Sequence, residues 1–166
     1  LTKVKVYGTL DKNQQAPYNT IFKVASLTKP VFALTVLKLI DEGLLDLQEP
    51  LHKYWIDPDI NNDKRYKKLT PFIVLTHQTG FPNWRYMTDS NKLHFDSMDE
   101  SRYAQNFDEN GNNMETLKYY EANAAANLLT TVEDYGRFVA YVINGAELNQ
   151  ELFQEMKKHQ VKLREN

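Results

Sequence analysis

The chain has 166 residues, of which 42% are hydrophobic, so it is long enough to bury one compact core. Its net charge of −2 arises from acids and bases spread along the chain, which gives no sign of a nucleic-acid-binding surface or a polybasic membrane anchor. The absence of cysteine excludes disulfides, thiolate metal sites and a cysteine nucleophile, and no apolar run is long enough to cross a bilayer.

The N-terminal residues alternate in polarity. Residues 3–7 predict a strand, and residues 8–18 contain the breakers typical of turns. Residues 20–25 alternate again and predict a short strand or extended lead-in that delivers the chain to Ser26. Because the chain starts with Leu1 and has no charged-then-apolar leader, we expect a mature or trimmed chain without a signal peptide.

The stretch from residue 24 to residue 40 combines a hydroxyl, an amine and an apolar run. Ser26 and Lys29 are three residues apart, so at the start of a helix they lie on the same face. Serine becomes a nucleophile when a neighbouring group takes its proton, and a lysine in a dry pocket can lose its own proton and do so. The run at residues 31–40 is apolar almost all round, which predicts a buried central helix.

The limits of this helix follow from its flanking residues. Gly43 is placed to end it, and Pro30 falls within the first turn, where it removes at most one intrahelical hydrogen bond. The side chains expected to be among the most buried are those of Phe32, Val36, Leu39 and Ile40.

Further helices are expected downstream. Residues 57–68 predict a solvated loop, and Thr70 with Pro71 predicts the start of a short helix that ends near His77. Apolar side chains recurring between residues 132 and 142 predict an amphipathic helix capped by Thr131, and residues 148–156 predict a last helix. A helix end followed by a glycine turn is typical of a structural histidine, so His77 is not assigned as a general base. The other histidines lack metal-ligand spacing, and we expect no metal site.

Residues 22–30 and 37–51 resemble the serine beta-lactamase-related family, which opens its active site with Ser-x-x-Lys. This family includes class C beta-lactamases, penicillin-binding proteins, D-alanyl-D-alanine carboxypeptidases and esterases. Residues 69–82 and 124–135 resemble two later stretches of the family. The resemblance implies an α/β (α+β) fold of the beta-lactamase/transpeptidase type, here one partial domain over residues 1–166, a helix-rich portion with an incomplete antiparallel sheet.

The resemblance also implies a serine hydrolase. Ser26 would attack the carbonyl of a beta-lactam, a D-alanyl peptide or an ester, and Lys29 would act on its proton. The backbone N–H of Ser26 would supply half of the oxyanion hole. No cofactor is required, the partner is a small-molecule or peptide substrate, and the expected location is extracytoplasmic, that is periplasmic, secreted or surface-anchored. The oligomeric state stays open.

Two motifs that the resemblance predicts do not occur in the sequence. The family's Tyr-x-Asn is due between His94-Phe95 and Met98, and its Lys-Thr-Gly or His-x-Gly strand is due after Asn166. We therefore expect the chain to be an incomplete record of a larger protein, with breaks near residues 95–96 and between residues 110 and 123.

Two other interpretations remain open. One is a catalytically inactive family member that binds peptidoglycan-like or peptide ligands, which would suit the missing motifs. The other is a plain helical domain in which Ser26 and Lys29 are a helix cap and a surface charge. Reaction with a fluorophosphonate or a labelled penicillin separates the hydrolase from both.

Overall fold

Helices make up most of the regular structure in the computed structural model, which describes residues 3–10, 14–81, 102–114 and 123–161. Backbone contacts divide the chain into a first unit, residues 1–32 and 87–144, and a second unit, residues 33–86 and 145–166. The single domain expected over the whole chain stays a prediction. Among the described residues, no helix has the length and apolar character needed to cross a membrane.

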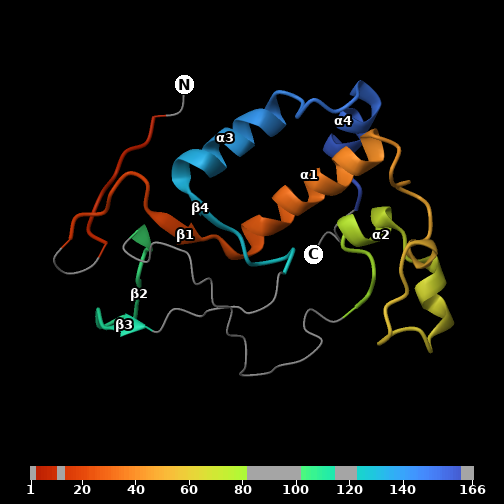
Figure 1. Cartoon of the computed structure of the whole chain (residues 1–166), viewed down its shortest axis with the longest axis horizontal. Helices are drawn as coiled ribbons and strands as arrows, with labels where there is room; N and C mark the ends of the chain where they lie inside the picture. Colours follow the sequence, from red (N-terminus) through yellow and green to blue (C-terminus); the bar gives the residue numbers. More distant parts are fainter. Residues whose placement is uncertain (1–2, 11–13, 82–101, 115–122, 162–166) are drawn as a thin grey trace, which may run out of the picture. The chain divides into compact units, whose positions relative to one another are not determined.

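The elements run through both units in chain order (Figure 1). They are β1 (Ile21–Lys23), η1 (Ala25–Leu27), α1 (Thr28–Asp41), η2 (Leu51–Lys53), η3 (Lys64–Lys68), α2 (Pro71–Leu75), β2 (Asn106–Phe107), β3 (Asn113–Met114), β4 (Leu129–Thr131), α3 (Val132–Ile143) and α4 (Gln150–Lys157).

In the first unit, β1 pairs antiparallel with β4, and the two strands lie side by side in Figure 1. Ile21 stands opposite Thr131, and Lys23 stands opposite Leu129. Apolar and β-branched residues favour extended backbone on both strands. The strand expected at residues 20–25 is therefore confirmed, and it carries the chain directly to Ser26.

Strands β2 and β3 form a second antiparallel pair, and Asp108 lies in the turn that connects them. The Asp108 carboxylate accepts a hydrogen bond from the backbone N–H of Asn112 (2.8 Å), and its carbonyl accepts one from Gly111 (3.0 Å). A break was expected between residues 110 and 123, and residues 110–114 of that interval belong to this paired hairpin. The rest of that interval, residues 115–122, and the expected break near residues 95–96 lie outside the described residues.

Helix α3 begins at the end of β4. The Thr131 hydroxyl accepts a hydrogen bond from the backbone N–H of Asp134 (3.1 Å), which confirms the predicted cap. The same hydroxyl donates to the Asp134 carboxylate (2.8 Å). The aspartate thus bonds the capping side chain, because it is one methylene shorter than the glutamate that usually reaches back to the cap backbone. The helix ends at Ile143, and Asn144 caps its C-terminus.

In the second unit, the C-terminal end of α1 closes as predicted. Gly43 has a φ of +72°, and its N–H donates to the Ile40 carbonyl (3.0 Å) while that of Leu44 donates to the Leu39 carbonyl (2.8 Å). This pair of bonds is a Schellman motif, in which glycine adopts the left-handed conformation without a Cβ clash. The N–H of Asn149, the cap of α4, donates to the Asp41 carboxylate (3.2 Å).

Helix α2 also starts where the sequence predicts. The Thr70 hydroxyl accepts a hydrogen bond from the backbone N–H of Ile73 (3.2 Å), and Pro71 occupies the first turn. Phe72 N–H donates to the Leu47 carbonyl (3.0 Å), which fastens α2 to the chain that follows α1. The last expected helix is confirmed as α4, capped by the side chain of Asn149.

Two expected elements are wrong. Residues 3–7 form no strand, because an alternating pattern needs a hydrogen-bonding partner and no described segment pairs with them; the nearest pairing is an isolated bridge between Thr9 and Gln15. Within the predicted loop at residues 57–68, residues 64–68 form the 3-10 helix η3. The Asp63 carboxylate starts it by accepting the Arg65 backbone N–H (2.9 Å).

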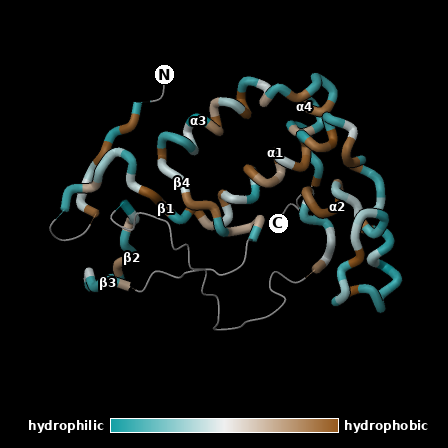
Figure 2. The backbone as a smooth tube through the Cα atoms, viewed as in Figure 1, coloured by the Kyte–Doolittle hydropathy of each residue, from teal (hydrophilic) through white to brown (hydrophobic). Residues whose placement is uncertain are grey.

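The expected burial of α1 is also wrong. Figure 2 shows hydrophobic residues recurring along this helix, yet Phe32 is 48% exposed. Val36, Leu39 and Ile40 are half-buried, and Leu37 is the buried residue of the run. An all-round apolar sequence shows what a helix can bury, whereas actual burial depends on which faces other elements cover. Buried apolar side chains among the described residues are Leu10, Ile21, Leu37, Ala146 and Leu152.

Replacing Leu37 by Ala should lower the free energy of unfolding by about 2–4 kcal/mol, because it removes a buried side chain and leaves a cavity. Leu44 belongs to the same unit and is 62% exposed, so Leu44→Ala is the matched control and should cost about 0.5 kcal/mol or less. Chemical denaturation of both variants measures the difference. Equal losses would contradict the assignment of Leu37 to the core.

The Asp63 carboxyl should titrate near pH 2. Hydrogen bonds from the Arg65 side chain, and next from its backbone N–H, lower the pKa of Asp63 from 3.8 to about 2. A lowered pKa means that this group stabilises the fold above pH 3.8, and that its contribution is lost as the pH falls through about 2. Carbon-13 NMR at low salt, where an exposed pair is least screened, measures the midpoint.

Arg65→Gln is the corresponding control, because it removes the charged donor and should return the Asp63 midpoint most of the way to its ordinary value. A wild-type midpoint that already lies at the ordinary value would contradict the pairing.

Candidate active site

The turn between β1 and α1 carries an unusual backbone conformation. Ala25 has a φ of +44°, a left-handed conformation that residues with a Cβ rarely adopt. Two hydrogen bonds brace it, from Leu27 N–H to the Val24 carbonyl (3.0 Å) and from Val24 N–H to the Leu128 carbonyl (3.2 Å). Such conformations persist only where their surroundings hold them. Ser26 follows directly and is exposed.

The structure brings Ser26 and Lys29 together. The Lys29 amine donates a hydrogen bond to the Ser26 hydroxyl at 2.8 Å, so the predicted proximity of the two groups is confirmed. Lys29 is half-buried, which does not fit its interpretation as a simple surface charge. The catalytic roles of both residues stay a prediction.

A backbone carbonyl from a distant part of the chain completes the surroundings of the amine. Lys29 Nζ also donates to the Ala125 carbonyl (3.2 Å), 96 positions further along the sequence. The Asn123 side chain shapes this segment by accepting the Ala125 N–H (2.7 Å). From the sequence, residues 124–135 were identified only as a stretch that resembles the family, and Ala125 was not assigned to the site, since a backbone acceptor leaves no mark of its own in the sequence.

Two side chains that the sequence analysis missed hold the same turn. The Thr28 hydroxyl donates to the Ala25 carbonyl (2.6 Å) and accepts the Leu128 N–H (3.0 Å). The Tyr135 hydroxyl, on α3, donates to the Leu27 carbonyl (3.1 Å). The only signal for Thr28 in the sequence is its position inside Ser-x-x-Lys, and Tyr135 looks like an ordinary member of an apolar stripe.

This arrangement is suited to nucleophilic chemistry. A hydroxyl and an amine 2.8 Å apart can exchange a proton, with the amine donating when charged and accepting when neutral. Ser26 precedes the first residue of α1, where the positive end of the helix dipole stabilises developing negative charge.

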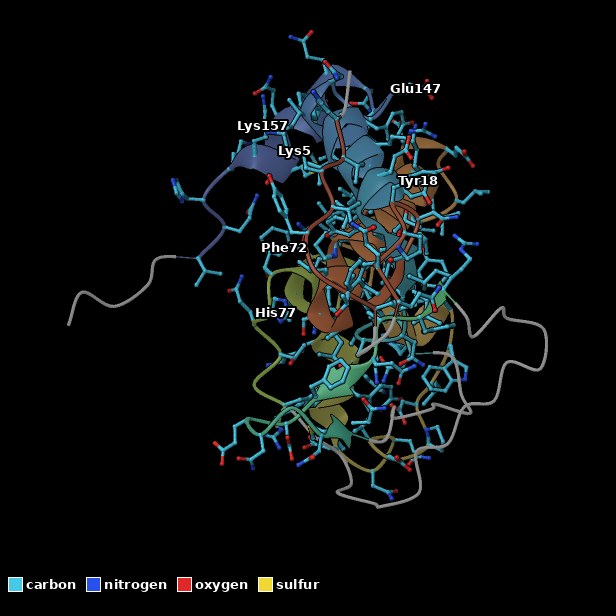
Figure 3. The ribbon with its side chains drawn as sticks, turned by 90° about the vertical axis from the view of Figure 1, so that its left-hand side faces the viewer. Lys5, Tyr18, Phe72, His77, Glu147 and Lys157 are labelled. Carbon is cyan, nitrogen blue, oxygen red and sulfur yellow. The ribbon has the colours of Figure 1, made fainter. Side chains whose placement is uncertain are left out.

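His77 lies two residues after Leu75, the last residue of α2, and Figure 3 labels it together with Phe72 of that helix. Its φ is +58°, its backbone N–H donates to the Val74 carbonyl (3.1 Å), and its side chain is exposed. Its backbone thus closes the turn after α2, in line with the structural interpretation. His52 packs edge-on against Tyr66, with ring centroids 5.7 Å apart, and His94 lies outside the described residues.

Comparison with known proteins identifies similar sequences. A family model described as "Beta-lactamase" matches residues 2–99. Esterase EstB of Burkholderia gladioli is 33% identical over 85 residues, which cover 48% of this chain and 21% of the esterase. The match thus spans about a fifth of that relative's length.

Solved structures share the fold. The octameric penicillin-binding protein homologue from Pyrococcus abyssi matches 94% of this chain and 53% of its own, with a TM-score of 0.72 and 17% identity. The D-alanine carboxypeptidase AmpC from Burkholderia cenocepacia matches 89% of this chain and 57% of its own, with a TM-score of 0.64 and 18% identity.

The expected fold class is confirmed by these structures and by the mixture of helices with short antiparallel sheets. The chain spans little more than half the length of the two solved relatives. With more than half of its residues matched by the family model, the chain belongs to the beta-lactamase family, a family of serine hydrolases.

Proposed function

We propose that this chain carries the nucleophile of a serine hydrolase that is acylated at Ser26 by a beta-lactam, a D-alanyl peptide or an ester. The observation that carries the proposal is the 2.8 Å contact between the Lys29 amine and the Ser26 hydroxyl at the start of α1. Similarity to an esterase and to a D-alanine carboxypeptidase supports an acyl substrate. Membership of the family supports an extracytoplasmic location.

The proposed reaction has two stages. The Ser26 oxygen bonds to the substrate carbonyl carbon while its proton passes to the neutral Lys29 amine, and the Ser26 N–H stabilises the oxyanion. Collapse of this intermediate breaks the bond to the leaving amine or alcohol, which takes the proton back from Lys29. Water then cleaves the acyl-enzyme and restores Ser26.

The Ala125 carbonyl supports the assignment of Lys29 as proton acceptor. A carbonyl oxygen can only accept a hydrogen bond, so one N–H of the Lys29 amine must point at the Ala125 oxygen, 3.2 Å away. In the neutral amine this leaves the lone pair free to face the Ser26 hydroxyl. The carbonyl would therefore orient the base rather than take part in proton transfer.

The alternative is a catalytically inactive member that binds peptidoglycan-like or peptide ligands. The observation that favours it is that no Tyr-x-Asn lies between His94-Phe95 and Met98, where the family resemblance places this motif. Calorimetric binding of a D-alanyl peptide, without turnover and without covalent labelling of Ser26, would favour this alternative over the hydrolase.

Ser26→Ala should abolish covalent labelling by a fluorophosphonate or a penicillin, because it removes the attacking oxygen. Intact-protein mass spectrometry measures the added mass, and thermal unfolding checks that the fold is kept. Ser90→Ala is the matched control, since Ser90 has no lysine three residues further on. Labelling that survives in the Ser26 variant would place the nucleophile elsewhere.

Lys29→Arg should slow acylation roughly 10²- to 10⁴-fold, about as much as Lys29→Met, because arginine keeps the charge but does not give up its proton. Lys64→Met removes a positive charge in η3 and serves as the control, with wild-type labelling expected. Stopped-flow or quenched labelling gives the rates. A wild-type rate in Lys29→Arg would mean that only the charge matters, contrary to the proposed role.

A further inference from the structure

Thr28 lies between the two residues of the proposed catalytic pair and is 9% exposed. We infer that Thr28 is a positioning residue, whose hydroxyl sets the geometry of Ser26, Lys29 and the Ala125 carbonyl. This inference rests on the proposed function of Ser26 and Lys29 and deepens it, because it names the group that keeps these two side chains correctly placed relative to each other.

Both hydrogen-bonding roles of the Thr28 hydroxyl are used. It donates to the Ala25 carbonyl at 2.6 Å, and it accepts the backbone N–H of Leu128 at 3.0 Å. One bond reaches back to the residue that precedes Ser26, and the other reaches a segment 100 positions along the chain. A single buried side chain therefore joins the nucleophile turn to the segment that carries Ala125.

The first bond acts on the nucleophile. Ala25 has a φ of +44°, so the turn needs external contacts to keep this conformation, and its carbonyl is held by the Thr28 hydroxyl. If Ala25 relaxed toward an ordinary conformation, the Ser26 side chain, attached to the next residue, would change direction relative to Lys29.

The second bond acts on the partner of the base. Leu128 lies three residues after Ala125, and it is fastened at both of its backbone groups: its N–H binds Thr28 and its carbonyl accepts the Val24 N–H (3.2 Å). Loss of the Thr28 bond would leave the Ala125 segment held by fewer contacts. The carbonyl that orients the Lys29 amine would then be less well placed.

Thr28→Val tests this inference, because valine has nearly the shape of threonine but neither donates nor accepts. Thr28→Ser keeps the hydroxyl. Thr28→Ala removes the hydroxyl without placing a second methyl against the Leu128 N–H, and it replaces the valine variant if that variant does not fold.

Thr20→Val is the matched control within the first unit. Thr20 is buried (4% exposed), and its hydroxyl also donates to the carbonyl three residues before it, that of Pro17, at 2.6 Å. Within the part of the chain that the structure describes, Thr20 forms no hydrogen bond with Ser26 or Lys29. A variant at this position loses a comparable hydrogen bond outside the proposed site.

The measured quantities are the limiting rate of Ser26 acylation by a fluorophosphonate, the reagent concentration at half-saturation, and the pH dependence of the rate. Thr28→Val should lower the limiting rate roughly ten- to a hundredfold and change its pH dependence, with half-saturation unchanged, since misplacement affects the chemical step. Thr28→Ser should recover most of the rate, and Thr20→Val should react like the wild type.

A wild-type rate in Thr28→Val, or an equal loss in Thr20→Val, would overturn the inference. Failure of the wild-type protein to label at all would instead refute the proposed function. The inference is then decided by amide hydrogen exchange at Leu128, which should accelerate in Thr28→Val and stay slow in Thr28→Ser. Unchanged protection at Leu128 in the valine variant would overturn it.

Discussion

The antiparallel pairing of β1 with β4 is the constraint on which the proposed site depends. Three residues on each strand bring the nucleophile turn next to a segment about a hundred positions later in the chain. Closing so long a loop costs conformational entropy, and contacts between residues close in the sequence do not offset that cost. The pairing therefore needs support at its ends, and the bonds from Val24 and Thr28 to Leu128 provide it beside Ser26.

The strained conformation of Ala25 and the contacts around it belong to one arrangement. A left-handed alanine is unfavourable by itself, yet it lies between a strand and a helix start that are both fixed by hydrogen bonds. Thr28, Tyr135 and the Leu128 backbone all contact residues within this turn. The backbone thus limits the Ser26 oxygen to a few positions, since rotation about the Cα–Cβ bond is the only torsion between the backbone and that oxygen.

The residues that surround Ser26 come from two regions of the chain. The family model matches residues 2–99 and so includes Ser26, Thr28 and Lys29, whereas Ala125 and Tyr135 lie beyond it. The structure nevertheless places both of the later residues in hydrogen-bonding contact with the first region. The geometry of the proposed site is therefore an observation separate from the sequence match.

Sequence alone determined the features that depend on neighbours a few residues apart. The caps at Thr70 and Thr131, the helix end at Gly43 and the shared face of Ser26 and Lys29 all follow from contacts three to five positions along the chain. Tertiary structure alone decided the β1–β4 partnership, the Ala125 carbonyl as a second partner of Lys29, and the burial of Leu37 while Phe32 stays exposed. The physical reason is that pairing and burial depend on which distant segments meet, and hydrophobic periodicity carries no information about the identity of those segments.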